Sequence, residues 1–141
     1  MSDTSEPIRF ETWVDPVVEA VGFPARGVYA EFALTSVLGP TAMVAMRAVV
    51  AMLEAAKIPV SVDLSDFARS IGVGAGTGNN AVIRKALQRL EHFGLARPVE
   101  GGYAVRTWVA PLTERQLSRA SQRVRLVHSR MTAQRFRHQA S

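Results

Sequence analysis

The sequence contains no cysteine, which excludes disulfide bonds and thiolate metal sites and fits a reducing compartment. It has no apolar run near the roughly 20 residues that a membrane-spanning helix requires. Its first residues, MSDTSEPIRFETW, show neither the basic nor the apolar region of a secretory signal. These absences predict a cytoplasmic protein without membrane association. With 141 residues, 48% of them hydrophobic, the chain is expected to form one compact core with an appended helix.

Acidic residues are scarce in the second half of the chain. Nine of the 12 acidic residues, but only four of the 17 basic ones, precede Arg69. The net charge is therefore −5 up to residue 68 and +10 from Arg69 onward. Such asymmetry predicts a polyanionic partner for the basic half. The alternative is a solvated basic surface that only confers solubility.

Two segments lead up to the basic half. Residues 1–36 mix isolated apolar residues with Pro and Gly, so we expect an N-terminal extension with a frayed end and one or two short helices packed on the core. The next segment, LGPTAMVAMRAVVAMLEAAK, predicts a long helix with Pro40 in its first turn and Thr41 as its cap. Its methionines are interpreted as core residues: Met43, Met46 and Met52.

A strand and a short helix follow. The alternation in IPVSV, residues 58–62, predicts a short edge strand. Asp63 and Asp66 resemble a catalytic pair, but they occupy the N-cap and third position of the helix in DLSDFARSIG, where carboxylates stabilise a helix start. GVGAGTGNN, residues 72–80, lacks the spacing of a phosphate-binding loop and predicts a mobile turn.

The stretch NNAVIRKALQRLEHFGLARPVEGGYAVRT contains a basic helix and a hairpin. Helical spacing predicts a helix over residues 79–93, capped by Asn79 or Asn80 and ended by Gly94. Its core-facing residues are Val82, Ile83, Ala86, Leu87, Leu90 and Phe93, and its outward residues are Ala81, Arg84, Lys85 and Gln88. Residues 96–107 predict two strands around Gly101 and Gly102. The resulting order of helix, strand, helix, helix, strand, strand is that of a winged helix-turn-helix.

The run DLSDFARSIGVGAGTGNNAVIRKALQRLEHFGLARPVEGGYAVR resembles the winged helix-turn-helix family, over roughly residues 40–111. The likeness rests on the pattern of helix, turn, helix ending in LxxxGL, and Gly-tipped wing. VYAEFALTSVLGPTA is also similar to a stretch in small actinobacterial winged-helix proteins, a likeness that brings no function with it. The turn GVGAGTG departs from the family in being longer and richer in Gly. We therefore expect a mainly α fold with a small β-hairpin (α+β), in which a winged domain spans residues 37–111.

The resemblance implies that the helix over 79–93 enters the major groove of double-stranded DNA and that the wing over 96–107 contacts the backbone or minor groove. Arg84 and Lys85 suit guanine or phosphate, and Gln88 and Asn80 suit adenine. With a two-residue Gly101–Gly102 loop, Arg97 and Arg106 lie directly opposite each other, and a phosphate would relieve their repulsion. The candidate DNA-binding residues are Asn79, Asn80, Arg84, Lys85, Gln88, Arg97 and Arg106.

Residues 112–138 predict a basic amphipathic helix. Apolar residues recur in it at spacings of three and four: Leu117, Ala120, Val124, Val127 and Met131. This seam favours a homodimer contact, although it also suits docking on the protein's own core. The arginines of the helix either add phosphate affinity or form a solvated face, and a basic amphipathic helix can also lie on an anionic membrane.

Catalysis is not expected. His92, His128 and His138 are scattered, without metal-ligand spacing or a Ser, His and acid set, and no cofactor, metal or small-molecule site is evident. The favoured function is a DNA-binding transcriptional regulator associated with the nucleoid. The alternative is a winged-helix adaptor that binds protein partners in a transcription or replication complex, which would show exposed apolar residues on the third helix.

Overall fold

The computed structural model describes residues 6–140, without the side chains of 136 and 138–140. The fold is a mixture of helices and strands, in agreement with the α+β expectation. The helices are α1 (Pro16–Val21), the π-helix η1 (Ala30–Leu34), α2 (Thr35–Leu38), α3 (Pro40–Ala56), α4 (Leu64–Ser70), α5 (Val82–His92), α6 (Glu114–Ser118) and α7 (Gln122–Ala140). The strands are β1 (Pro7–Trp13), β2 (Phe23–Pro24), β3 (Val60–Asp63), β4 (Ala96–Val99), β5 (Gly102–Arg106) and β6 (Trp108–Val109).

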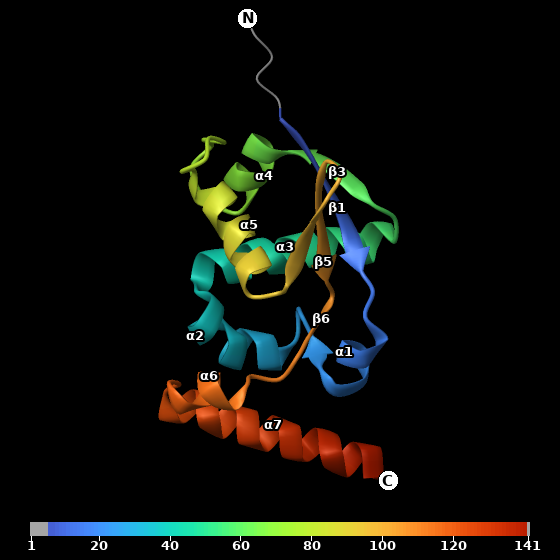
Figure 1. The fold of residues 1–141 in the computed structure, drawn as a ribbon, viewed down its shortest axis with the longest axis vertical. Helices are drawn as coiled ribbons and strands as arrows, with labels where there is room; N and C mark the ends of the chain where they lie inside the picture. The colour runs from blue at the N-terminus through green and yellow to red at the C-terminus, as the bar shows by residue number, and fades with distance from the viewer. Residues whose placement is uncertain (1–5, 141) are drawn as a thin grey trace, which may run out of the picture.

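A four-stranded sheet in the order β3-β1-β5-β4 is larger than the expected hairpin (Figure 1). β1 lies inside it, antiparallel to β3 and parallel to β5. The expectation of a frayed end and helices in the N-terminal extension is therefore wrong for residues 7–13. Ile8 and Phe10 are buried while Arg9 between them is exposed, which is the period-two pattern of a strand with one buried face.

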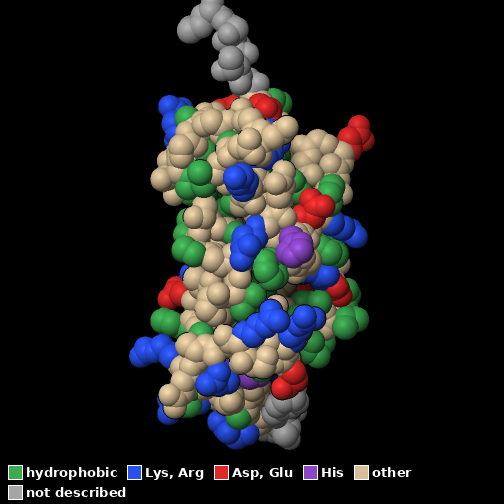
Figure 2. Space-filling view, turned by 60° about the vertical axis from the view of Figure 1, so that its left-hand side comes forward, with side chains coloured by type: hydrophobic (Ala, Val, Ile, Leu, Met, Phe, Trp, Pro, Cys, Tyr) green, Lys and Arg blue, Asp and Glu red, His purple; other side chains and the backbone are tan. Residues whose placement is uncertain are grey.

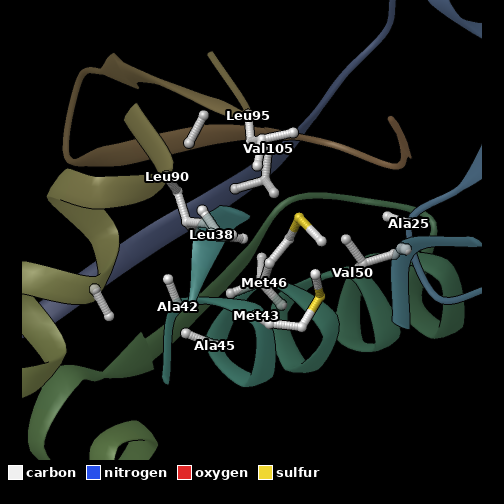
Figure 3. Packing of buried hydrophobic residues seen from close by; sticks show 14 of the residues in the cluster. Ala25, Leu38, Ala42, Met43, Ala45, Met46, Val50, Leu90, Leu95 and Val105 are labelled. Carbon is white, nitrogen blue, oxygen red and sulfur yellow. The ribbon is translucent and has the colours of Figure 1, made fainter. Parts of the chain in front are cut away.

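Helix α3 crosses one face of the sheet and carries much of the core (Figure 1). Met43 and Met46 are buried and Met52 packs against the same cluster, so their interpretation as core residues is confirmed. Figure 3 shows Met43 and Met46 packed among buried hydrophobic side chains of several elements. The expected cap at Thr41 is wrong, because Gly39, at φ 92°, is the N-cap and Pro40 is the first helical residue.

The junction between β3 and α4 follows the sequence prediction. β3 is an edge strand, and the Asp63 carboxylate caps α4 by accepting a 3.0 Å hydrogen bond from the Asp66 amide. Its other oxygen accepts a 2.8 Å hydrogen bond from the Glu6 amide, just ahead of β1. Asp63 therefore has a structural role that joins the N-terminal strand to α4.

The hairpin of β4 and β5 has a different register from the predicted one. Val99 pairs with Gly102, so the two-residue loop is Glu100–Gly101, with Gly101 at φ 79°. Arg97 consequently lies opposite Ala104 and not opposite Arg106. Gly102 is the residue that allows β1 to approach, since a Cβ there would lie 1.7 Å from the Arg9 carbonyl oxygen. The close parallel pairing of β1 and β5 thus requires Gly102 in a strand position and Gly101 in the turn.

Helices α6 and α7 lie against η1 and α2, at the end of the molecule opposite α4 (Figure 1). Val124 is 6% exposed, and the other residues of the predicted seam pack against the same core: Leu117, Ala120, Val127 and Met131. The seam proposed for a homodimer is therefore covered by the protein's own core, which is the other possibility that its spacing allowed. A homodimer stays a prediction and would need a different surface.

Between residues 6 and 140, no helix is both long enough and apolar enough to cross a bilayer.

Candidate nucleic-acid interface

Helix α5 places its apolar face on the core and a polar face in solvent. The buried residues are Ile83, Ala86, Leu87 and Leu90, as predicted. Phe93 is partly buried, whereas Val82 is 49% exposed and not in the core as predicted. Val82 is the first residue of the helix and borders a surface hollow at the start of α3, so no core residue covers it.

The outward face of α5 consists of Lys85, Gln88 and His92. Their spacings of three and four place them on one side of the helix, and all three are exposed. Within the part of the chain that the structure describes, the side chains of Lys85 and Gln88 make no hydrogen bond or ion pair. They are therefore available to a partner molecule.

Asn79 and Asn80 lie in a turn ahead of α5 and do not cap it. The N-cap is Ala81, which is extended and has no side-chain capping bond. The Ala81 amide donates a 2.9 Å hydrogen bond to the Gly78 carbonyl, so the two asparagines occupy the middle of a tight turn. Both are exposed, at the end of α5 where helical amides carry partial positive charge.

Arg84 is engaged within the chain. Its guanidinium forms an ion pair with Glu6 and donates hydrogen bonds of 3.0 and 3.3 Å to the Thr77 carbonyl. Its side chain is only 25% exposed, so the prediction of an outward, unpaired Arg84 is wrong. The residue ties α5 to the Gly-rich turn and to the segment before β1, because both lie beside the helix start.

Arg89 holds α5 against the end of α2. Its guanidinium donates to the carbonyls of Leu38 and Val37, the latter at 3.1 Å. Its Cζ atom also lies 5.0 Å from the centre of the Phe93 ring, a cation–π contact. Carbonyls at the C-terminal end of a helix are unpaired and carry partial negative charge, so this residue satisfies them while it fixes the position of α5.

The two arginines of the hairpin meet at Trp13. The Cζ atoms of Arg106 and Arg97 lie 3.6 and 4.8 Å from the centre of the Trp13 ring. Arg106 also pairs with Asp15 at 2.7 Å, donates to the Gly94 carbonyl at 2.8 Å, and is only 16% exposed. Arg97 is exposed. The prediction that both guanidiniums await a phosphate is therefore wrong for Arg106, because Asp15 already balances its charge.

Two ionisable groups near the candidate interface have shifted pKa values. The hydrogen bond from Arg106 lowers the pKa of Asp15, and the hydrogen bond from the Val18 amide adds to the effect. Burial raises the pKa of Tyr103, and the negative charge of Glu91 raises it further. Glu91 is exposed and lies three residues after Gln88, so it places one carboxylate at the edge of the outward face of α5.

Some cations on the surface are paired with carboxylates and others are not. In the described part of the chain, the arginines paired with Asp or Glu are Arg9, Arg26, Arg47, Arg69, Arg84 and Arg106. In the same part, the cations without such a partner include Lys85 of α5, Arg97 of β4, and Arg115, Arg119, Arg123 and Arg130 from α6 to α7. Figure 2 shows Lys and Arg side chains at successive heights on one side of the molecule. An anionic partner would meet an excess of positive charge here.

Sequence reasoning missed His92, Arg89 and Trp13 as parts of this region. His92 was detectable, because it continues the spacing of Lys85 and Gln88 by one further turn. Trp13 was not detectable, since its contact with the hairpin depends on the pairing of β1 with β5, in which Trp13 lies beside Arg106.

No family model, curated protein or solved structure matches this chain. Within the described residues there is also no group of three or more His, Asp or Glu residues placed to hold a metal ion.

Proposed function

We propose that the chain binds double-stranded DNA as a winged helix-turn-helix protein and acts as a transcriptional regulator associated with the nucleoid. In this proposal residues 37–111 form the winged domain, α4 and α5 form the helix-turn-helix, and β4 and β5 form the wing. The element order from α3 to β5 supports it. The central position of β1 is an addition to the family pattern.

The observation that carries the proposal is the outward face of α5. It bears an unpaired lysine, an unpaired glutamine and a histidine, and the carboxylate of Glu91 lies at its edge. An α-helix fits the major groove, where Lys85 can donate to guanine O6 and N7 and the Gln88 amide can pair with N6 and N7 of adenine. Arg97 on the wing suits a backbone phosphate, and Asn79 and Asn80 lie where the start of α5 meets the groove edge.

Arg84 and Arg106 have a supporting role in this proposal. Arg84 fixes the start of α5 through Glu6 and Thr77, and Arg106 fixes the wing through Asp15. Releasing either guanidinium to a phosphate would leave a carboxylate unpaired beside the DNA. We therefore propose that they position the helix and the wing, and that Lys85 and Gln88 read the bases.

Titration of labelled duplexes tests the proposal. Sites are first selected from a pool of randomised 24-base-pair duplexes, and binding to the selected and random duplexes is measured at two salt concentrations. With about five phosphate contacts, raising salt from 50 to 200 mM weakens binding by about 10³-fold. Lys85→Ala with Gln88→Ala should lower affinity for the selected site by about 10-fold or more and affect random duplexes less.

A matched control uses Lys57, an exposed lysine at the other end of α3 from α5 (Figure 1). Lys57 has φ 61°, and Asn tolerates this left-handed conformation. Lys57→Asn should therefore remove one charge without a change in sequence preference. Absence of wild-type binding at 50 mM salt would contradict the proposal.

The adaptor remains a second candidate because of one observation. A surface hollow of about 320 Å³ beside α5 is lined largely by apolar residues, among them Leu38, Pro40 and the exposed Val82. Genome-wide immunoprecipitation distinguishes the two functions. A DNA-binding regulator should lose its sites with Gln88→Ala. An adaptor should keep its distribution along the genome with Gln88→Ala, because Gln88 does not line the hollow, and should lose that distribution with Val82→Ser.

A further inference from the structure

A second hollow lies beyond the C-terminal end of α5. It has a volume of about 330 Å³, and its lining includes Ser36 of α2, Phe93 after α5, Arg115 and Gln116 of α6, and Arg119, the C-cap residue of α6. It is separate from the outward face of α5, and the candidate DNA-binding residues are absent from its lining.

The hollow is lined by two arginines, and neither is paired with a carboxylate in the described part of the chain. Arg115 and Arg119 are one helical turn apart, both are exposed, and neither forms an ion pair within residues 6–140. Glu114, their nearest acid in sequence, makes no ion pair with them. Two like charges at this spacing repel each other, and an anion between them would remove the repulsion. Two guanidinium groups also provide a geometry that suits phosphate oxygens.

The backbone around these arginines is fixed. Thr113 and Gln116 form a capping box, in which each side chain accepts a hydrogen bond from the other residue's amide, at 3.1 and 2.9 Å. Leu117, on the opposite side of the segment, packs against the core, and Ala120 packs against the core while it also lines the hollow. The arginines thus extend from an ordered segment, so binding an anion would order only their side chains.

The position of the hollow relative to α5 indicates which anion Arg115 and Arg119 would bind. α5 has 11 residues and is about 16 Å long, while the major groove is about 12 Å wide. A helix lying across the groove therefore ends over the sugar-phosphate backbone, and Phe93 at that end borders the hollow. We propose that Arg115 and Arg119 bind a backbone phosphate of the DNA that α5 reads, so that α6 extends the footprint beyond the winged domain. This inference rests on the proposed function.

The test compares two pairs of substitutions in the full-length chain. Arg115→Gln with Arg119→Gln removes the charge of the hollow. Arg130→Gln with Arg137→Gln removes two exposed arginines from another surface hollow, on α7. Binding to the selected 24-base-pair duplex and to random duplexes is measured from 50 to 200 mM salt, with a melting curve for each variant.

The first pair should lower the slope of log affinity against log salt by about two units, with an unchanged preference for the selected site and an unchanged melting temperature. The control pair should change the slope by less than half a unit. An unchanged slope for the first pair, or an equal drop for both pairs, overturns the inference while the proposed function stands. No binding by the wild type overturns both.

A further experiment distinguishes whether the hollow binds a phosphate of the DNA backbone or free inorganic phosphate. Inorganic phosphate is added at constant ionic strength, and the Nε–H signals of Arg115 and Arg119 are followed by NMR. We expect DNA to shift both signals at concentrations where inorganic phosphate does not. Equal shifts from inorganic phosphate, together with an unchanged salt slope for DNA, would make the hollow a site for a small anion and overturn the inference.

Discussion

The hydroxyl oxygen of Tyr29 lies 2.7 Å from Nδ1 of His128, across the contact between η1 and α7. The same oxygen accepts a 2.9 Å hydrogen bond from the buried Leu112 amide. Because the amide can only donate, the hydroxyl proton stays available for the contact with Nδ1 of His128. One hydroxyl therefore joins three segments: the residue before η1, the connection to α6, and α7.

Tyr29→Phe should lower the free energy of unfolding by about 1 to 3 kcal/mol, because it leaves the Leu112 amide buried without an acceptor. The ring stacking of Tyr29 on Phe23, at 4.0 Å between centres, is retained in this variant. Urea unfolding followed by circular dichroism measures the effect. Tyr103→Phe is the control, since the Tyr103 hydroxyl makes no hydrogen bond within the described residues, and it should change stability by less than about 0.5 kcal/mol. Equal effects for the two variants would contradict the assignment.

Asp15→Asn should remove a pH-dependent part of the stability. The pKa of Asp15 is lowered in the folded state, chiefly by the hydrogen bond from Arg106. The stabilisation is therefore present above the ordinary value of 3.8 and is lost as pH falls through the folded-state pKa. Asparagine is also a good N-cap, so the variant removes the charge and keeps the cap of α1.

Melting temperatures of the wild type and Asp15→Asn, measured from pH 7 down to pH 2, should differ most at neutral pH and converge in acid. Glu54→Gln is a matched control, because Glu54 pairs with Arg26 while both side chains are about half exposed. The melting temperature of Glu54→Gln should differ little from that of the wild type over the whole pH range. A gap for Asp15→Asn that widens in acid would contradict the prediction.

Arg84→Ala should destabilise the protein even without DNA, by about 1 kcal/mol or more, since it leaves Glu6 and the Thr77 carbonyl without their donor. Lys85→Ala, one residue further along, removes an exposed and unpaired side chain and should stay within about 0.5 kcal/mol. Thermal melts of both variants make the comparison. If Arg84→Ala has the same melting temperature as the wild type, the ion pair between Arg84 and Glu6 does not stabilise the start of α5.

Val124→Asp should lower stability by about 3 kcal/mol or more, because it places a charge in the contact between α7 and the core. Leu126→Asp is the control on the same helix, where the side chain is 48% exposed, and it should leave the melting temperature nearly unchanged. Light scattering distinguishes packing of α7 on the protein's own core from a contact between two copies of the chain. A folded Val124→Asp chain of lower mass than the wild type would show that Val124 lies between two copies.

The helical half of the fold was largely predictable because its spacing is local. The long helix α3, the Asp63 cap and the buried face of α5 follow from the three-and-four spacing of apolar residues and from capping chemistry. Gly94 ends α5 in the left-handed conformation, at φ 72°, as predicted. These features depend on residues within a few positions of each other, and the sequence displays them directly.

The candidate site was less predictable because its electrostatics are non-local. Arg84 and Lys85 are adjacent and look alike in the sequence, yet only Arg84 has a carboxylate partner, 78 residues away in the chain. Arg106 likewise meets Asp15 only because β1 runs beside β5. No spacing rule connects residues so far apart, so which cations stay free could be known only from the fold.

The central position of β1 has a consequence for how the molecule forms during synthesis. β1 leaves the ribosome before its parallel partner β5, which follows about 90 residues later. Because the ribosome adds roughly 5 to 20 residues per second, β1 lacks this partner for several seconds. Contacts between such distant segments also slow folding. Until β5 emerges, Ile8 and Phe10 lack their final surroundings, and a nascent chain paused before residue 102 exposes an unpaired β1 edge to its neighbours. During the interval between the first and the last strand of this sheet, the unpaired edge of β1 can therefore pair with another chain.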